Sequence, residues 1–140
     1  MSDVERLAAL AIDCGLSIHR DLGPGLLESV YETLLAAKLA RSGVRVERQK
    51  PVDIEYEGIR VREGFRADLL IERALIVEVK STERLAAVHS RQVLTYLRLL
   101  GLPLGLLMNF GGETFPEGLK RVMNDRGGAP HRLAPSPSPA

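Results

Sequence analysis

The spacing of apolar residues predicts two helices in the first third of the chain. Residues 4–20 carry apolar side chains at the intervals of an amphipathic helix, and the break at 23–25 (Gly-Pro-Gly) ends it. A second helix is predicted from about 26 to 41, before a Ser-Gly pair. In this helix Glu28 falls inside the apolar arc and Glu32 just beyond its edge. The helix dipole favours an acid near the N-terminus, but it does not account for an acid that faces inward.

The middle of the chain has the composition of β-strands. Residues 44–56 alternate between apolar and polar positions, and Pro51, which cannot donate a ladder hydrogen bond, predicts an edge strand or a bulge. The remaining predicted elements are strands at 59–63, 66–71 and 75–80, a helix at 84–100, a strand at 104–110 and a short strand or turn at 119–124. The order α-α-β-β-β-β-α-β predicts an α/β (α+β) domain with a central mixed sheet flanked by helices.

Three charged residues interrupt two otherwise apolar strands. Residues 66–71 and 75–80 are rich in leucine, isoleucine and valine, yet they carry Asp68, Glu78 and Lys80. A strand that is nearly all apolar is normally buried on both faces, so these charges need an explanation. Because side chains alternate along a strand, Glu78 and Lys80 share one face of theirs.

The expected register of this hairpin brings two acids together. A three-residue loop superimposes the apolar faces of the two strands, with Ala67 predicted on the same face as Leu69. Leu69 then lies opposite Val77, and Asp68 lies opposite Glu78. Directly opposed residues have Cβ atoms about 4.5–5.5 Å apart, so the two carboxylates are predicted to be neighbours.

Two carboxylates at that separation repel each other unless one is protonated or a cation lies between them. A hard divalent cation with oxygen ligands resolves the repulsion, and Mg²⁺ needs only one or two protein carboxylates in addition to substrate phosphates. The alternative is a hairpin in which Asp68, Glu78 and Lys80 form a solvated edge or a buried ion pair.

The helix predicted at 84–100 places two polar residues in its apolar face. His89 and Gln92 are expected to project into the middle of that face. A buried polar group without a hydrogen-bond partner costs about 1–3 kcal/mol, so each must be satisfied. Each alone is more typical of a satisfied core residue. Together, on a helix that follows Lys80 closely, they favour a contact with the same carboxylates.

Composition limits the classes of protein to which the chain can belong. Its 140 residues with 45% hydrophobic content suit one globular domain, and a net charge of +1 excludes a polybasic coat for nucleic acid. The single cysteine, Cys14, excludes a disulfide framework and suits a small buried side chain. No apolar run approaches 18 residues and no signal-peptide pattern is present, so we expect a cytoplasmic protein without a membrane segment.

The C-terminal residues differ in composition from the rest. Residues 125–140 are rich in proline, serine and glycine, which predicts a disordered tail after a single domain at 1–124. Basic residues around the predicted strands alternate with acids, which favours a solvated charged face. These basic residues are Arg41, Arg45, Arg48, Lys50, Arg60, Arg62 and Arg66.

Several motifs resemble one family of proteins. The segment at 25–31, GLLESVY, matches the signature of the GxxExxY family, which belongs to the PD-(D/E)XK, or restriction-endonuclease-like, nuclease superfamily. The other matching blocks are GFRADLLIE, LIVEVK, HSRQVLTYLRL and GLLMNFG. The resemblance covers residues 7–124. One departure is Ala67, which stands where the superfamily's name has proline.

The resemblance implies a restriction-endonuclease-like core and a role for each matching residue. Asp68 and Glu78 would hold Mg²⁺ or Mn²⁺, and Lys80 would polarise the attacking water and offset phosphate charge. Glu28 would be an additional metal or water ligand, and Gln92 would help to orient the catalytic site. The residues implied in supporting roles are Tyr96, His89, Tyr31 and Glu32.

The leading functional hypothesis is therefore a Mg²⁺-dependent nuclease that acts on DNA, and we expect a homodimer. One alternative is a nuclease-fold module that binds nucleic acid or a protein partner without cutting it. A further alternative is a structural or assembly protein in which the acids form a stabilising network. Metal-dependent cleavage would distinguish the first hypothesis from the other two.

Overall fold

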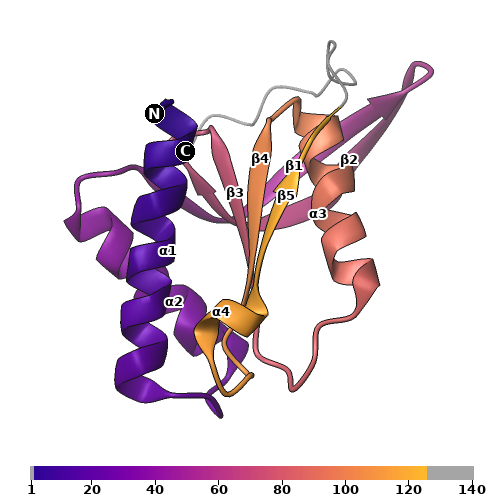
Figure 1. Ribbon diagram of the computed structural model, residues 1–140. Helices are drawn as coiled ribbons and strands as arrows, with labels where there is room; N and C mark the ends of the chain where they lie inside the picture. The colour runs from indigo at the N-terminus through magenta and orange to yellow at the C-terminus, as the bar shows by residue number, and fades with distance from the viewer. Residues whose placement is uncertain (1, 126–140) are drawn as a thin grey trace.

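The computed structural model describes residues 2–125 and shows a mixed sheet with helices on both faces (Figure 1). In chain order the elements are α1 (Asp3–Leu22), α2 (Glu28–Arg41), β1 (Val46–Tyr56), β2 (Ile59–Ile71), β3 (Leu75–Lys80), α3 (Ala87–Leu100), β4 (Leu104–Asn109), α4 (Phe115–Gly118) and β5 (Leu119–Met123). The α+β class predicted from the sequence is confirmed. The predicted tail lies outside the described residues, apart from Asp125.

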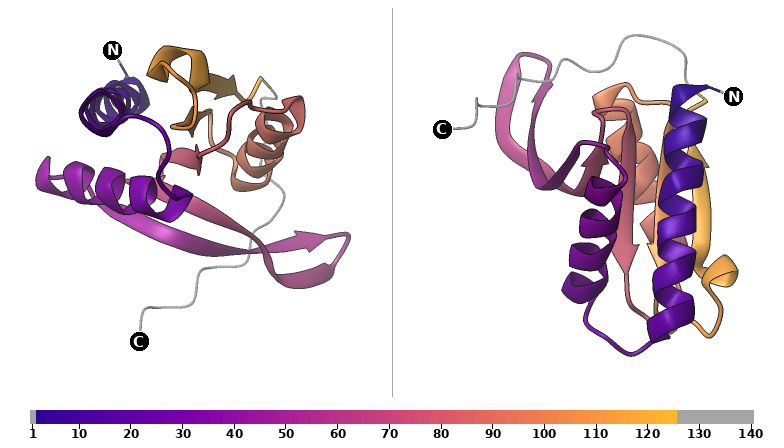
Figure 2. Two further views of the ribbon diagram at one scale, coloured as in Figure 1. Left: turned by 90° about the horizontal axis from the view of Figure 1, so that it is seen from below. Right: turned by 90° about the vertical axis from the view of Figure 1, so that its left-hand side faces the viewer.

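Within the described residues the sheet has five strands in the order β1-β2-β3-β4-β5. Neighbouring strands are antiparallel except β3 and β4, which are parallel. A parallel pair needs a crossover connection, and α3 supplies it. Helices α1 and α2 cover one face of the sheet and α3 covers the other, as the turned views show (Figure 2).

Each face of the sheet has its own hydrophobic core. The larger core joins α1 and α2 to side chains such as Leu69 and Val77, and the smaller one packs Val93 and Leu97 of α3 on the sheet. Burying one such side chain contributes about 1.5–3 kcal/mol. A Cβ on Gly15 would lie 2.6 Å from the ring of Phe115, so only glycine lets α1 pack this closely there.

Strand β2 differs from the prediction because Gly64 does not end it. The residues predicted as two strands, 59–63 and 66–71, form one strand of 13 residues. The ladder with β1 shifts register near Asp53, whose carboxylate accepts a hydrogen bond from the backbone N–H of Glu63. A bulge of this kind bends a strand without ending it. Gly64 fits there because a Cβ would lie 2.8 Å from Ile54.

The far half of the β1–β2 hairpin projects from the body of the molecule (Figure 1). Ile59 and Val61 in this part are 64% and 44% exposed, so they contribute little to either core. β1 is an edge strand, as Pro51 predicted. The one-turn helix α4 is not predicted by the sequence pattern, whereas the short final strand is confirmed.

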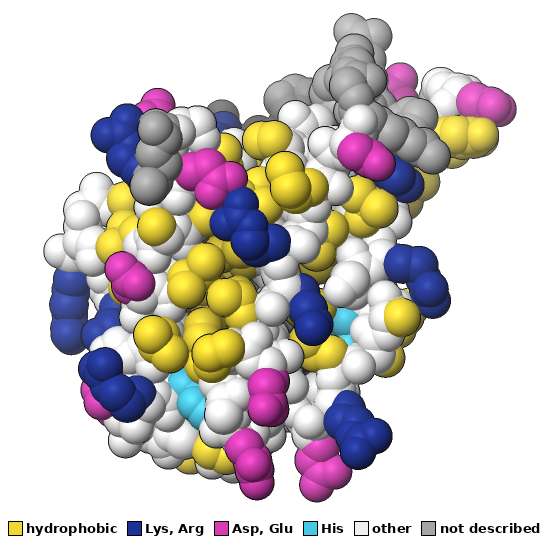
Figure 3. Space-filling view, in the orientation of Figure 1, with side chains coloured by type: hydrophobic (Ala, Val, Ile, Leu, Met, Phe, Trp, Pro, Cys, Tyr) yellow, Lys and Arg dark blue, Asp and Glu magenta, His cyan; other side chains and the backbone are white. Residues whose placement is uncertain are grey.

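The face seen in Figure 3 exposes apolar side chains near its centre, beside α1. The edge strand β5 contributes to the exposed apolar surface of the molecule, since Met123 is 63% exposed. Among residues 2–125, no helix has both the length and the apolar character needed to cross a bilayer.

Candidate metal-binding site

The β2–β3 hairpin has the register that the sequence predicts. Ile71 pairs with Leu75 and Leu69 with Val77, across a three-residue loop. Beyond Leu69 the backbone ladder is replaced by side chains. The N–H of Asp68 donates to Oε2 of Glu78 at 2.8 Å, and the N–H of Val79 donates to Oδ2 of Asp68 at 2.9 Å. Each carboxylate thus accepts a backbone hydrogen bond from the other strand, which fixes the two acids side by side.

The alternation of side chains in β2 breaks at Asp68. Leu69 belongs to the core under α1 and α2, while Ala67 and Leu70 both belong to the core under α3. The prediction that Ala67 shares a face with Leu69 is therefore wrong. The break lies across from Gln49 in β1, which has a φ of 47°. A positive φ is uncommon outside glycine, so this irregularity marks a constrained part of the sheet.

Glu78 is the buried member of the acid pair. It is 5% exposed, and its pKa is raised to about 9, first by burial and then by the charge of Asp68. The positive charge of Lys80 acts in the opposite direction but is outweighed. At neutral pH and without a cation, Glu78 is therefore protonated, and a divalent cation at this position would compete with that proton.

Gln49 connects the acid pair to α2 and was missed by the sequence analysis. Its Nε2 donates to Oδ1 of Asp68 at 3.1 Å and to Oε1 of Glu32 at 2.6 Å. Glu32, 6% exposed, also forms an ion pair with Arg48 at 2.9 Å. The chain Glu32–Gln49–Asp68 thus holds the Asp68 carboxylate from the side opposite β3. Gln49 lies across from Asp68 only because the bulge near Asp53 shifts the register that the turn sets, so the sequence pattern gives no signal for this contact.

The two acids of α2 are the reverse of what the helical pattern predicts. Glu28 is the first residue of α2 and is exposed, so the prediction that it faces inward is wrong. Glu32, predicted at the edge of the apolar arc, is buried instead. The reason is that α2 packs against β1, where Arg48 and Gln49 supply polar partners for an acid. Glu32, rather than Glu28, is therefore the helix acid that connects to Asp68.

Lys80 lies at the end of β3 on the strand face that carries Glu78. It is half-buried, and within residues 2–125 its ammonium group has no ion pair or hydrogen-bond partner. Its charge acts on Glu78 to lower the pKa of that carboxyl. Lys80 is therefore a cation next to the acid pair that is free to contact a substrate.

α3 brings one polar aromatic residue near the acids. Tyr96 stacks on Phe65 of β2 with ring centroids 4.0 Å apart. Burial raises the pKa of Tyr96, and the charges of Glu78 and Asp68 add to the effect. Gln92 lies one turn before Tyr96 but is exposed, so the prediction that it projects into the apolar face is wrong. The buried stripe of α3 is narrow and consists of Val93 and Leu97.

Two further residues singled out by the sequence have local contacts of their own. His89 is half-buried and its Nδ1 accepts the backbone N–H of Ala86 at 3.1 Å, which caps α3. The hydroxyl of Tyr31 donates to the carbonyl of Gly23 at 2.5 Å and accepts the N–H of Leu26 at 3.2 Å. Tyr31 therefore fixes the loop before α2, and His89 fixes the start of α3.

The donor set suits a hard divalent cation that shares its coordination with substrate. Asp68 and Glu78 supply carboxylate oxygens from adjacent strands, and the charge of Asp68 adds to burial in raising the pKa of Glu78. No group of three or more His, Cys, Asp or Glu side chains that could hold a metal occurs within residues 2–125. Mg²⁺ retains several waters and binds through one or two carboxylates, so two acids fit Mg²⁺ better than zinc.

The mixed sheet, its flanking helices and the acid pair between β2 and β3 define a restriction-endonuclease-like fold. Comparison with family models gives a match to the PD-(D/E)XK nuclease superfamily over residues 5–122. The chain belongs to the PD-(D/E)XK nuclease superfamily. Comparisons with curated proteins and with solved structures give no significant match.

Proposed function

We propose that the protein is a Mg²⁺-dependent nuclease that hydrolyses phosphodiester bonds in DNA. The observation that carries the proposal is the pairing of Asp68 and Glu78 across adjacent strands, next to the unpaired cation Lys80. We also assign the chain to the GxxExxY branch of the superfamily on the segment at 25–31. In that motif Tyr31 supports the loop before α2, as its two hydrogen bonds indicate.

In this mechanism Asp68 and Glu78 hold the cation. When bound, Mg²⁺ would activate a water molecule and stabilise negative charge on the phosphate. Lys80 places a positive charge where negative charge accumulates in the transition state, and it orients the attacking water by hydrogen bonding. Gln49 keeps the Asp68 carboxylate in place, and Tyr96 closes the α3 side of the site.

The direct test is metal-dependent cleavage by the purified chain. We expect hydrolysis of DNA oligonucleotides in the presence of Mg²⁺ or Mn²⁺, and none with a chelator or with Ca²⁺ as a matched divalent control. Product ends identified by mass spectrometry would show whether a phosphodiester bond has been hydrolysed. Absence of cleavage with both metals on single-stranded, duplex and branched DNA would contradict the proposal.

Replacing Gln49 with alanine should weaken Mn²⁺ binding about 10- to 100-fold, because loss of a hydrogen bond behind a metal ligand typically has that effect. Gln49 is exposed, so the fold should survive. Titration calorimetry measures the affinity. Thr33→Ala is the matched control, since Thr33 accepts a bond from Arg48 in the same network without touching Asp68. Equal affinities for Gln49→Ala and the wild type would contradict this role.

A second candidate function is a nuclease-fold module that binds nucleic acid or a protein partner without cutting. The observation that favours it is the absence, within residues 2–125, of a third acidic or histidine ligand beside Asp68 and Glu78. Such a module would bind DNA with a steep salt dependence and show no turnover with any metal. The cleavage assay therefore separates the two functions.

A further inference from the structure

A cavity of about 290 Å³ lies beside the proposed catalytic site. Its lining includes Asn109, which pairs with Lys80 in the parallel ladder between β3 and β4. Neighbouring strands are about 4.8 Å apart, so the cavity begins one strand away from Lys80. Alternation puts Asn109 on the same side of the sheet as Leu107, which packs in the core under α3. Ile76 packs in the same core, and Glu78 and Lys80 share its strand face, so the cavity lies on their side of the sheet.

The walls of the cavity are held in place by Asn109. Its Oδ1 accepts the N–H groups of Thr82 and Gly111, and its Nδ2 donates to the carbonyl of Thr82 at 2.8 Å. Asn109 is 2% exposed, so its polar atoms serve the fold and are not available to a ligand. A Cβ on Gly118 would lie 2.4 Å from the carbonyl oxygen of Asn109, so α4 packs tightly on this wall. The cavity is thus preformed.

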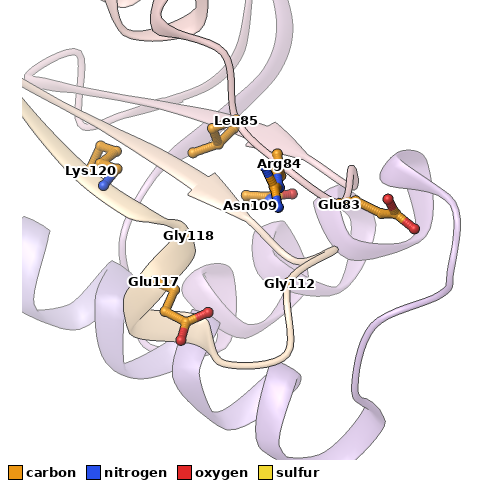
Figure 4. A pocket seen from close by; sticks show the side chains of 8 residues that line it. All are labelled: Glu83, Arg84, Leu85, Asn109, Gly112, Glu117, Gly118 and Lys120. Carbon is orange, nitrogen blue, oxygen red and sulfur yellow. The ribbon is translucent and has the colours of Figure 1, made fainter.

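Two cations reach the cavity from opposite walls. Arg84 comes from the loop between β3 and α3, and Lys120 comes from β5 (Figure 4). Neither side chain has an ion pair or hydrogen bond with another residue in the range 2–125. Arg48 of β1 and Arg66 of β2 differ in this respect, because they pair with Glu32 and Glu63. Arg84 and Lys120 are therefore available to form ion pairs with an anionic ligand.

The cavity also has two acids, and their positions matter for its ligand. Figure 4 shows the Glu83 carboxylate extending away from Arg84 and Lys120. Glu117 belongs to the α4 wall and is exposed. Leu85 adds an apolar wall on the α3 side. This lining suits a phosphate bound between the two cations, with an attached sugar against Leu85.

We propose that this cavity binds a phosphate of the DNA strand next to the phosphate that is hydrolysed. The inference rests on the proposed function and specifies where the substrate is gripped. It explains how a chain with a net charge of +1 can hold a polyanion, because two unpaired cations act beside Lys80. Glu117 opposes phosphate binding and limits the affinity.

The test measures DNA binding without cleavage, with a chelator present and Asp68→Asn as the background. Fluorescence anisotropy with a labelled single-stranded oligonucleotide gives Kd over a range of salt concentrations. Adding Arg84→Ala and Lys120→Ala should weaken binding at least about 10-fold at 0.1 M salt. It should also reduce the slope of log K against log salt by about 0.7, since one neutralised phosphate on a single strand contributes about that much.

The matched control is Lys38→Ala with Arg41→Ala in the same background. These two cations line a different cavity, between α1 and α2 on the other side of the sheet. Arg84, Lys120 and Arg41 are exposed and Lys38 is half-buried, so none of the four substitutions should change the thermal unfolding temperature by much. The control pair should leave the salt slope as it is. The proposal would be overturned if both pairs of substitutions weakened DNA binding equally, or if replacing Arg84 and Lys120 did not weaken it.

Glu117→Gln provides a test with the opposite sign. Removing this charge should tighten DNA binding about 2- to 5-fold, as expected for one like charge near a phosphate. If the cavity instead bound a cation, the same variant would weaken binding of that cation and leave DNA affinity unchanged.

Cleavage of DNA by the wild-type protein is measured separately. If the protein binds DNA through Arg84 and Lys120 but never cleaves it, the phosphate subsite stands and the proposed nuclease activity is refuted.

Discussion

Asp68→Asn should reduce metal-dependent DNA hydrolysis at least about 100-fold, and Lys80→Met should do so through a different step. Asparagine keeps the shape of Asp68 but removes the charge that a cation needs, so Mn²⁺ binding and turnover should fall together.

Methionine at position 80 removes the cation beside the phosphate and leaves both carboxylates in place. Mn²⁺ affinity should then stay within a few-fold of wild type while single-turnover cleavage is lost.

The measurements are titration calorimetry for Mn²⁺ and quenched-flow cleavage of a labelled oligonucleotide. Lys38→Met is the matched control for Lys80→Met, because Lys38 lies on α2 on the opposite side of the sheet. Circular dichroism at the assay temperature establishes that each variant is folded. If both variants cleave at the wild-type rate, the acid pair is a structural feature and the catalytic proposal fails.

The hairpin could be predicted from the sequence because two constraints agreed. A one-residue slip would have moved the apolar residues of β3 to the wrong face, and a three-residue loop was the connection that avoided it. The positions of Asp68 and Glu78 followed from that register. The hydrogen bonds that the two carboxylates accept from backbone N–H groups could not be predicted in this way. They form because the backbone ladder between β2 and β3 stops at Leu69 and side chains take its place.

The helix residues were harder to place. A helical wheel gives an arc but not the partner element, so it could not show that Glu32 packs against polar groups of β1 while Glu28 is exposed. The same limitation applies to Gln92, which lies beside the narrow buried stripe of α3. Gln49 was missed because its importance depends on the alignment of β1 with β2, and the bulge near Asp53 obscures that alignment in the sequence.

Sheet and helices therefore contribute different kinds of information to the candidate site. The two metal-binding acids come from adjacent strands of one hairpin, where pattern and loop length determine their pairing. The groups around them come from β1, α2 and α3, whose packing is a tertiary property. Residues such as Gln49 and Asn109 act mainly by holding other groups, and only hydrogen-bond distances identify them.

The second large effect concerns the stability of the metal-free protein as pH rises. Glu78 has a pKa of about 9 in the folded state and about 4.5 when unfolded, so the folded state binds its proton more tightly. Its contribution to stability is complete below pH 4.5 and is lost as pH rises to about 9. The free energy of unfolding should fall over that window by at most about 1.4 kcal/mol per pH unit.

Glu78→Gln should remove this slope, because glutamine is neutral at every pH and can still accept the N–H of Asp68. At pH 8, with a chelator present, the variant should be about 2–5 kcal/mol more stable than wild type in urea unfolding. Glu47→Gln is the control. Burial raises the pKa of Glu47, but hydrogen bonds from Lys50 and Arg73 outweigh burial and lower it, so this variant should keep the wild-type slope above pH 5.

Mg²⁺ binding provides a second, independent measurement of the protonation of Glu78. A cation held by Asp68 and Glu78 must displace the Glu78 proton, so its affinity should increase with pH up to about 9. Calorimetry near pH 7.5 in buffers of different ionisation enthalpy should show about one proton released per cation bound. Glu78→Gln should release none. A wild-type protein that binds Mg²⁺ without proton release would place the cation away from Glu78, and the acid pair would then lose its role in metal binding.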